Sequence, residues 1–209
     1  MHSMTIARGR PMMLAFLFML SANAHALDQW WNGVKLDTQL GDYAVFLGSD
    51  QRMLEDESRL YHFNVKLGAS TKLTDALSAG LEFRVEDSDP VEDQYRDEQR
   101  LTPFASYKLR LSDYNADIRV RLENRWFDGD YSLRPRVRGK LSKKIDNIGL
   151  YASYEYFFNA TKGKYNQSRS ALGAELAIDN NLKVGAYLML LDGTGDDVHI
   201  LGSEFSYTF

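Results

Sequence analysis

The chain reads Ala116-Asp117-Ile118-Arg119-Val120-Arg121-Leu122-Glu123 near its middle, with apolar and charged side chains in strict alternation. The segment 133–141 repeats the pattern, with Leu133, Val137 and Leu141 on one face and four basic residues on the other. Successive side chains of a β-strand point to opposite faces, so each segment has one apolar and one charged face. Similar segments continue from about residue 43 to the C-terminus, and none of them has a convincing helical period. The sequence therefore predicts an all-β protein.

The links between these segments also alternate. Short turns rich in Asp, Asn and Ser, such as 112–115 and 146–147, are followed by longer polar links such as 87–97 and 192–197. This alternation is typical of outer-membrane barrels, so we predict a transmembrane antiparallel up-and-down β-barrel. Counting back from the C-terminus gives ten strands, at about 43–54, 58–70, 75–86, 98–111, 115–127, 131–143, 148–159, 168–178, 182–191 and 198–209.

Residues 27–42 do not fit an even strand number. Val34, Leu36, Thr38 and Leu40 alternate with polar residues, but an eleventh strand would break the parity expected of a bacterial barrel. We therefore expect 27–42 to form an N-terminal extension at the rim, with the barrel itself spanning 43–209. A count of twelve strands remains an alternative, and the sequence leaves open whether the extension plugs the lumen, caps the rim or joins the wall.

The first 26 residues have the three parts of a secretory signal peptide. Arg8 and Arg10 precede an apolar run of nine residues, 12–20, and Ala24 and Ala26 frame a cleavage site. A membrane-spanning helix needs about 20 apolar residues, so a signal peptide cleaved after Ala26 is the better interpretation. The chain has no cysteine, which excludes a disulfide scaffold and a thiolate metal site.

The C-terminus carries aromatic residues at every second position and ends in phenylalanine. This pattern resembles the terminal signal that the bacterial barrel-assembly machinery reads, here formed by Phe205, Tyr207 and Phe209. A secreted or periplasmic β-domain could show the same one-sided apolar pattern. The signal peptide, the terminal Phe and the aromatic residues near strand ends favour a barrel in the outer membrane of a Gram-negative bacterium. Its expected partners are membrane lipid, lipopolysaccharide and the assembly machinery.

If the apolar faces contact lipid, the charged faces line the interior. Fifteen inward Lys and Arg then outnumber nine inward Asp and Glu. An arginine-lined lumen favours anions, whereas a narrow barrel filled by Arg–Glu pairs would be closed; the sequence leaves both open. The candidate lumen-lining residues are Arg100, Arg110, Arg119, Arg121, Glu123, Arg125, Arg134, Arg136, Arg138, Lys140, Glu155 and Arg169.

Several short motifs resemble a known family. The chain is similar to the Gram-negative family called domain of unknown function 2490 in four segments: Glu98-Gln99-Arg100, 118–125, 133–138 and the later stretch 154–159. That resemblance implies a small outer-membrane barrel and transfers no activity. The basic ladder 134–140 is also similar, more weakly, to oligogalacturonate-specific porins, whose arginine-lined channels admit acidic sugars.

The leading functional hypothesis is therefore passage or capture of small anionic solutes. The rival is a closed structural or interaction barrel with acidic outer loops, and the third hypothesis is a lipid-modifying enzyme. We do not expect enzymatic activity. His62 and His199 are the two histidines beyond the signal peptide, and neither lies beside a plausible nucleophile and acid. Their separation gives no metal-ligand spacing, so no metal or other cofactor is expected. A net charge of −4 argues against nucleic acid as a partner.

Overall fold

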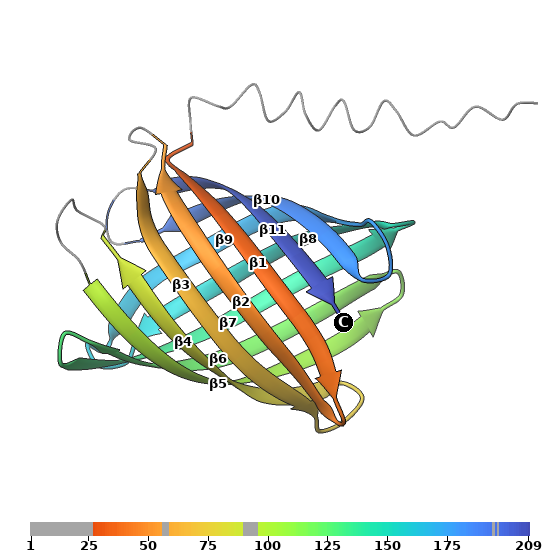
Figure 1. Ribbon diagram of the computed structural model, residues 1–209, viewed down its shortest axis with the longest axis horizontal. Coiled ribbons are helices and arrows are strands. Elements are labelled where there is room, and N and C mark those ends of the chain that lie inside the picture. The colour runs from red at the N-terminus through yellow and green to blue at the C-terminus, as the bar shows by residue number, and fades with distance from the viewer. Residues whose placement is uncertain (1–26, 56–58, 90–95, 194, 196) are drawn as a thin grey trace, which may run out of the picture.

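The computed structural model describes residues 27–55, 59–89, 96–193, 195 and 197–209. Eleven strands close into one barrel with an oval outline in Figure 1. They are β1 (Gln29–Leu40), β2 (Tyr43–Leu54), β3 (Leu60–Lys72), β4 (Leu77–Ser88), β5 (Arg96–Leu111), β6 (Tyr114–Phe127), β7 (Asp130–Ile145), β8 (Ile148–Asn159), β9 (Lys164–Ala177), β10 (Leu182–Asp192) and β11 (Val198–Thr208). The described residues include no helix of a length and hydropathy suited to crossing a membrane.

The predicted barrel is confirmed, and its strand number is one more than the preferred count. Residues 29–40 form β1, which pairs antiparallel with β2 and parallel with β11. The parity argument for a rim extension was therefore wrong for these residues, because a single parallel ladder lets an odd number of strands close. The alternation of Val34, Leu36, Thr38 and Leu40 is that of a wall strand whose backbone is paired on both sides. The expected signal peptide, 1–26, lies outside the described residues.

The two ends of the barrel differ, and each is named here by its connections. The loop end carries the links after β2, β4, β6, β8 and β10, and β1 also begins there, where the Asp28 amide donates to the His199 carbonyl at 2.9 Å. The turn end carries the five other links and the C-terminal Phe209. The chain therefore enters the wall at one end and leaves it at the other (Figure 1).

Several links between the strands contain residues that favour a turn. Gly41 and Gly129 have φ values of 60° and 84°, in the left-handed region that glycine adopts without strain. In the link between β9 and β10, the Asp179 carboxylate accepts backbone N–H bonds from Leu182 and Asn181, both at 2.7 Å. These donors favour the charged form and lower the pKa of Asp179.

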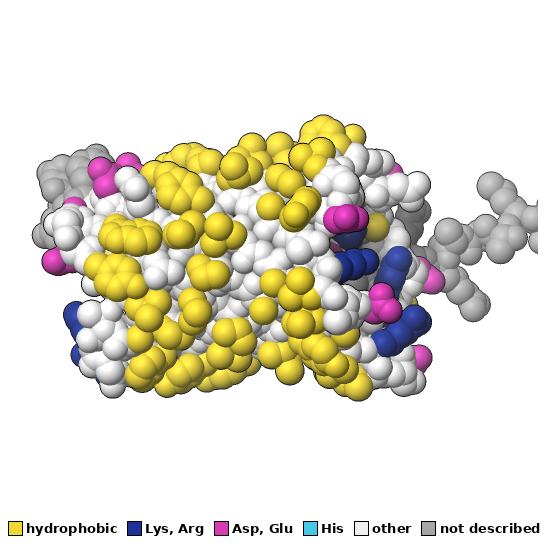
Figure 2. Space-filling view, turned by 90° about the horizontal axis from the view of Figure 1, so that it is seen from below, with side chains coloured by type: hydrophobic (Ala, Val, Ile, Leu, Met, Phe, Trp, Pro, Cys, Tyr) yellow, Lys and Arg dark blue, Asp and Glu magenta, His cyan; other side chains and the backbone are white. Residues whose placement is uncertain are grey.

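The outer surface of the wall is apolar and the interior is charged. Figure 2 shows hydrophobic side chains covering most of the barrel side, with charged side chains gathered near the two ends. Leu67, Leu81, Val120 and Val137 are each more than 40 % exposed, although they lie in the middle of strands. Among the described residues the buried apolar set is small: Trp31, Phe157, Met189 and Ile200. A soluble barrel would bury its apolar face, so this one is inside out.

Aromatic side chains lie over glycines inside the lumen. Gly173 and Gly202 pair across the sheet with Tyr151 and Tyr187, whose rings cover them. A Cβ on Gly173 would lie 2.5 Å from Cζ of Tyr151. The missing side chains therefore let each tyrosine lie flat against the wall and keep space open in the lumen.

Candidate functional site

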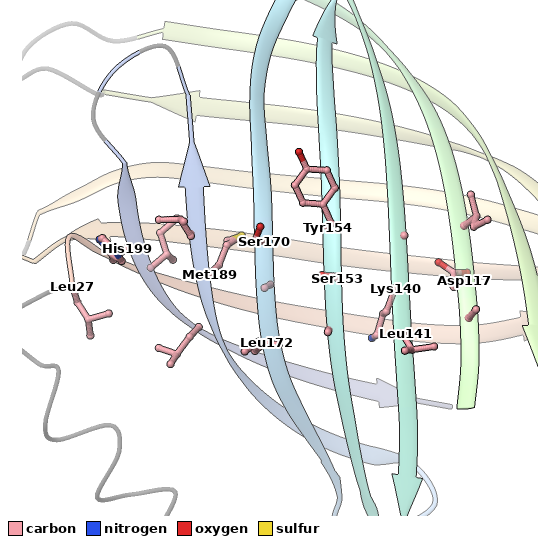
Figure 3. Close-up of a pocket in the computed structure, with 18 residues that line it drawn as sticks. Leu27, Asp117, Lys140, Leu141, Ser153, Tyr154, Ser170, Leu172, Met189 and His199 are labelled. Atoms are coloured by element: carbon pink, nitrogen blue, oxygen red, sulfur yellow. The ribbon is translucent and has the colours of Figure 1, made fainter. Parts of the chain in front are cut away.

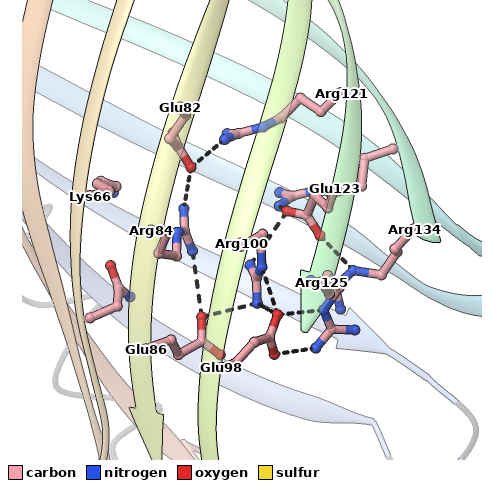
Figure 4. Close-up of polar contacts among 12 residues, drawn as sticks. Lys66, Glu82, Arg84, Glu86, Glu98, Arg100, Arg121, Glu123, Arg125 and Arg134 are labelled. Carbon is pink, nitrogen blue, oxygen red and sulfur yellow. Dashed lines mark hydrogen bonds and ion pairs between the residues drawn. The ribbon is translucent and has the colours of Figure 1, made fainter. Parts of the chain in front are cut away.

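The loop-end half of the lumen holds a continuous network of arginines and glutamates. Its centre is Glu123 on β6, which is completely buried. One carboxylate oxygen, Oε2, accepts from Arg134 Nε at 2.6 Å, and the other, Oε1, accepts from Arg136 Nη1 and from Arg100 Nη1, the latter at 3.5 Å. Three guanidinium groups from β5 and β7 thus share one carboxylate, as Figure 4 shows for Arg100 and Arg134.

Three further glutamates, Glu82, Glu86 and Glu98, extend the network across β4, β5 and β6. Glu98 contacts Arg100 Nη2 at 2.7 Å and accepts from Arg125 through both of its oxygens at 2.6 Å. Arg100 also donates to Glu86 at 3.0 Å. At the top of Figure 4, Glu82 pairs with Arg121 at 2.6 Å and with Arg84 at 3.1 Å.

The strand register explains why the carboxylates are needed. Arg121 lies opposite Arg136, and Arg100 lies opposite Arg125, so like charges face each other across two ladders. Like charges directly opposite are destabilising. The shared carboxylates, which are buried among these arginines, offset this repulsion.

The turn-end half is more open and its ion pairs are isolated. Arg138 donates to Asp117 at 2.9 Å, and Lys140 donates to Glu175 at 3.1 Å. The Glu175 side chain is 42 % exposed although it points inward, so water reaches it through the lumen. Arg119 is held by a hydroxyl, with its Nε 2.9 Å from Ser106 Oγ.

A cavity of about 510 Å³ runs through the lumen between these halves. Its lining reaches from Gln29, Tyr61 and Gln167 near the loop end to Lys140 and Glu175 toward the turn end. Eleven Lys and Arg but five Asp and Glu line it. Glu82, Glu98 and Glu123 do not line it, because they are buried among the arginines. The surface that a solute would meet is therefore strongly cationic.

The sequence comparison identifies the family. The family described as a protein of unknown function, DUF2490, matches residues 28–192, which is most of the chain. The chain belongs to the DUF2490 family. No curated protein matches it. Among solved structures, two of the KdgM porin, one of them in complex with disordered oligogalacturonate, each have a TM-score of 0.51 and 11 % identity, covering 75 % of this chain and 81 % of theirs. At that identity the likeness concerns the fold.

In this DUF2490 barrel the candidate lumen residues occupy inward positions of β5 to β9. One ion-pair network joins Arg100, Glu123, Arg125, Arg134, Arg136 and Glu155. Arg121 joins it by way of Glu82, whereas Arg138 and Lys140 have separate acidic partners. Arg110 is exposed near the turn end, and Arg169 has no carboxylate within ion-pair distance in the described part of the chain. The three residues of the expected assembly signal face outward, each more than a third exposed.

Trp31 is an inward residue that the sequence analysis did not place in the lumen. It came into the lumen with β1, the segment assigned to a rim extension, and its ring lies 3.9 Å from Cζ of Arg52 and 5.0 Å from Cζ of Arg169. The sequence feature that could have indicated this is the alternating pattern of the segment, in which Trp30 and Trp31 must point to opposite faces. Trp30 is 40 % exposed on the outer face, whereas Trp31 is buried.

The two histidines lie apart and take no part in a common site. His62 is buried in the lumen, 3.0 Å from Asn64 and 3.6 Å from Glu86. His199 is at the loop end, with its Nδ1 3.4 Å from Asp28. Within the described residues no group of three or more His, Cys, Asp or Glu is arranged to hold a metal ion.

A larger and apolar hollow of about 820 Å³ lies against the wall from β6 to β11. It is lined mostly by residues at outward positions, among them Leu141, Tyr154 and Leu172 in Figure 3. Small residues at Gly139, Ala152 and Ser170 form its floor. This hollow belongs to the apolar outer surface, and the charged candidate site is the lumen.

Proposed function

We propose that the protein is an outer-membrane barrel whose arginine-rich lumen passes or captures small anionic solutes. The cationic cavity is the observation that carries this proposal, with eleven basic and five acidic residues around about 510 Å³. The apolar outer wall, the expected signal peptide 1–26 and the C-terminal aromatic pattern support a location in the outer membrane of a Gram-negative bacterium. The barrel fold shared with the KdgM porins supports the channel part of the proposal.

The physical basis is the concentration of positive charge in a confined space. Low-dielectric walls focus the field of a one-signed lining and raise the local concentration of the opposite ion. Rings of Arg or Lys act in this way in anion pores. Guanidinium groups also offer paired N–H donors that match carboxylate and phosphate oxygens.

The test is the conductance of the refolded protein in a planar bilayer under a salt gradient. A barrel that has folded migrates differently on a gel before and after boiling, and this is checked first. We expect discrete openings with a reversal potential shifted toward that of the anion. Cation selectivity, or a folded barrel that remains electrically silent and binds no anion, would contradict the proposal.

A closed structural barrel is the second candidate, and the Glu123 network favours it. Buried ion pairs of this density fill space and fix strand positions. Changing Arg134, Arg136 and Arg138 to Gln separates the two functions. An anion pore should lose selectivity, whereas a closed barrel should chiefly lose resistance to unfolding.

A further inference from the structure

Two lumen arginines lack the acidic partners that their neighbours have. Arg52 on β2 and Arg169 on β9 have no Asp or Glu oxygen within 4.0 Å among the residues that the structure describes. The Nε atom of each is buried without a hydrogen-bond acceptor. Both guanidinium groups instead lie against the ring of Trp31, at 3.9 Å and 5.0 Å from its centroid.

Arg169 forms no ion pair with the glutamate opposite it, because that glutamate binds another arginine. It lies opposite Glu155 in the ladder between β8 and β9. Both oxygens of Glu155 are occupied by Arg136, whose Nε and Nη2 donate at 3.1 Å and 2.7 Å. Arg169 therefore contacts two aromatic rings, Trp31 and, at 4.7 Å, Phe157.

Arg52 likewise makes no direct ion pair with a described residue, although Tyr61, Glu86 and Asp50 lie near it. It lies opposite Trp31 on one side and His62 on the other. The nearby Glu86 is 3.0 Å from Arg100 and 3.6 Å from His62. Cation–π contact with Trp31 lowers the free energy of this guanidinium, but does not cancel its charge.

Trp31 itself is held in place by a short chain of hydrogen bonds. Its Nε1 donates to Gln29 Oε1 at 2.9 Å, and the Tyr61 hydroxyl donates to the same oxygen at 2.6 Å. The buried ring also packs with Met189 and Ile200. The ring is thus fixed beside two arginines that have no ion-pair partner, and Trp31, Arg52, Arg169, Gln29, Tyr61 and Met189 all line the cavity.

We propose that Arg52, Arg169 and Trp31 form a binding site for one oxyanion group, a carboxylate or a phosphate, of the solute in the lumen. An oxyanion here would accept from the unsatisfied guanidinium groups and neutralise charge that otherwise costs free energy. The inference rests on the proposed function and adds to it a defined site. Because the three residues come from β1, β2 and β9, the site exists once the barrel has closed.

The test uses the fluorescence of Trp31. Trp30→Phe and Trp126→Phe remove the two other tryptophans of the chain and leave Trp31 as the reporter. Iodide, an anion, and acrylamide, a neutral molecule, are compared as quenchers in a zwitterionic detergent. We expect Arg52→Gln with Arg169→Gln to lower the iodide quenching constant about fivefold, the factor that corresponds to roughly 1 kcal/mol, and to leave acrylamide quenching unchanged.

Two further variants control for charge and for folding. Lys162→Gln removes a positive charge from the exposed link between β8 and β9, outside the lumen, and should not change iodide quenching. Arg52→Lys with Arg169→Lys keeps both charges and should retain most of it. Gel mobility before and after boiling shows that each variant has folded.

Acetate and inorganic phosphate are then added as competitors. Protection of Trp31 from iodide by either one supports the site and identifies its chemistry. Unchanged iodide quenching in the double Gln variant, or no protection by either anion, would overturn the inference. Bilayer recordings distinguish the two proposals, because an anion-selective channel with unprotected Trp31 would refute the site alone.

Discussion

At the scale of single residues, Glu123 is the most consequential carboxylate of the lumen. Glu123→Gln would leave three arginines short of a shared negative charge in a buried space. Breaking a buried ion pair on one side costs about 3–5 kcal/mol. We expect a corresponding loss in the free energy of unfolding, measured by urea titration in liposomes.

Glu175→Gln is the matched control for that substitution. Glu175 has one basic partner, Lys140 at 3.1 Å, and its side chain is 42 % exposed to the lumen. Pairs in contact with water are worth roughly 0–1 kcal/mol. Equal losses for the two variants would contradict the role assigned to Glu123.

The glycine beneath Tyr187 gives a second prediction at this scale. A Cβ at Gly202 would meet three ring atoms of Tyr187, so Gly202→Ala must displace the tyrosine. Overpacking of this kind costs about 1–3 kcal/mol, which the same urea titration would detect. Gly139→Ala is the control, because nothing lies within 4 Å of its Cβ position, and it should leave stability unchanged or slightly higher.

At the scale of strands, period-two alternation was enough to assign inside and outside. Because Ile118 and Val120 face outward, the alternation requires their neighbours Arg119, Arg121 and Glu123 to face the lumen. The pairing of those charges was beyond the sequence, since it depends on register. Glu123 lies opposite Arg134, yet it also binds Arg100 from the other neighbouring strand.

The same pattern was present in β1, but a rule about the whole molecule overrode it. The expectation of an even strand number assigns residues 27–42 to an extension outside the wall. It therefore also places Trp31 outside the lumen. Local alternation was the stronger signal here, because it reports where each side chain points in the strand itself. The parity rule concerns where the termini lie, which the parallel ladder changes.

The parallel ladder between β1 and β11 can be tested by cross-linking. Asn32 and Ser203 are register partners, and their side chains meet at 2.7 Å. In a chain without cysteine, Asn32→Cys with Ser203→Cys should form a disulfide on oxidation, visible as a mobility shift without reductant. Asn32→Cys with Tyr207→Cys should not, because four residues along a strand add about 13 Å. The reverse result would place β1 elsewhere.

At the scale of the whole molecule, an odd number of strands places the two chain ends at opposite rims. β1 begins at the loop end beside His199, and Phe209 lies at the turn end, where its amide donates to the Asp37 carbonyl at 2.9 Å. If the longer links face outward, as in outer-membrane barrels, the start of β1 lies at the cell surface. A barrel with an even number of strands would keep both ends on the periplasmic side.

Single cysteines distinguish these two topologies in intact cells. Lys162→Cys and Asp28→Cys, both at the loop end, should react with a membrane-impermeant maleimide added from outside. Asp42→Cys, in the exposed link between β1 and β2 at the turn end, should react after the outer membrane is permeabilised. Labelling of Lys162→Cys without Asp28→Cys would show that the chain enters the wall from the periplasmic side. That result would remove β1 from its parallel ladder, and with it the tryptophan that contacts Arg52 and Arg169.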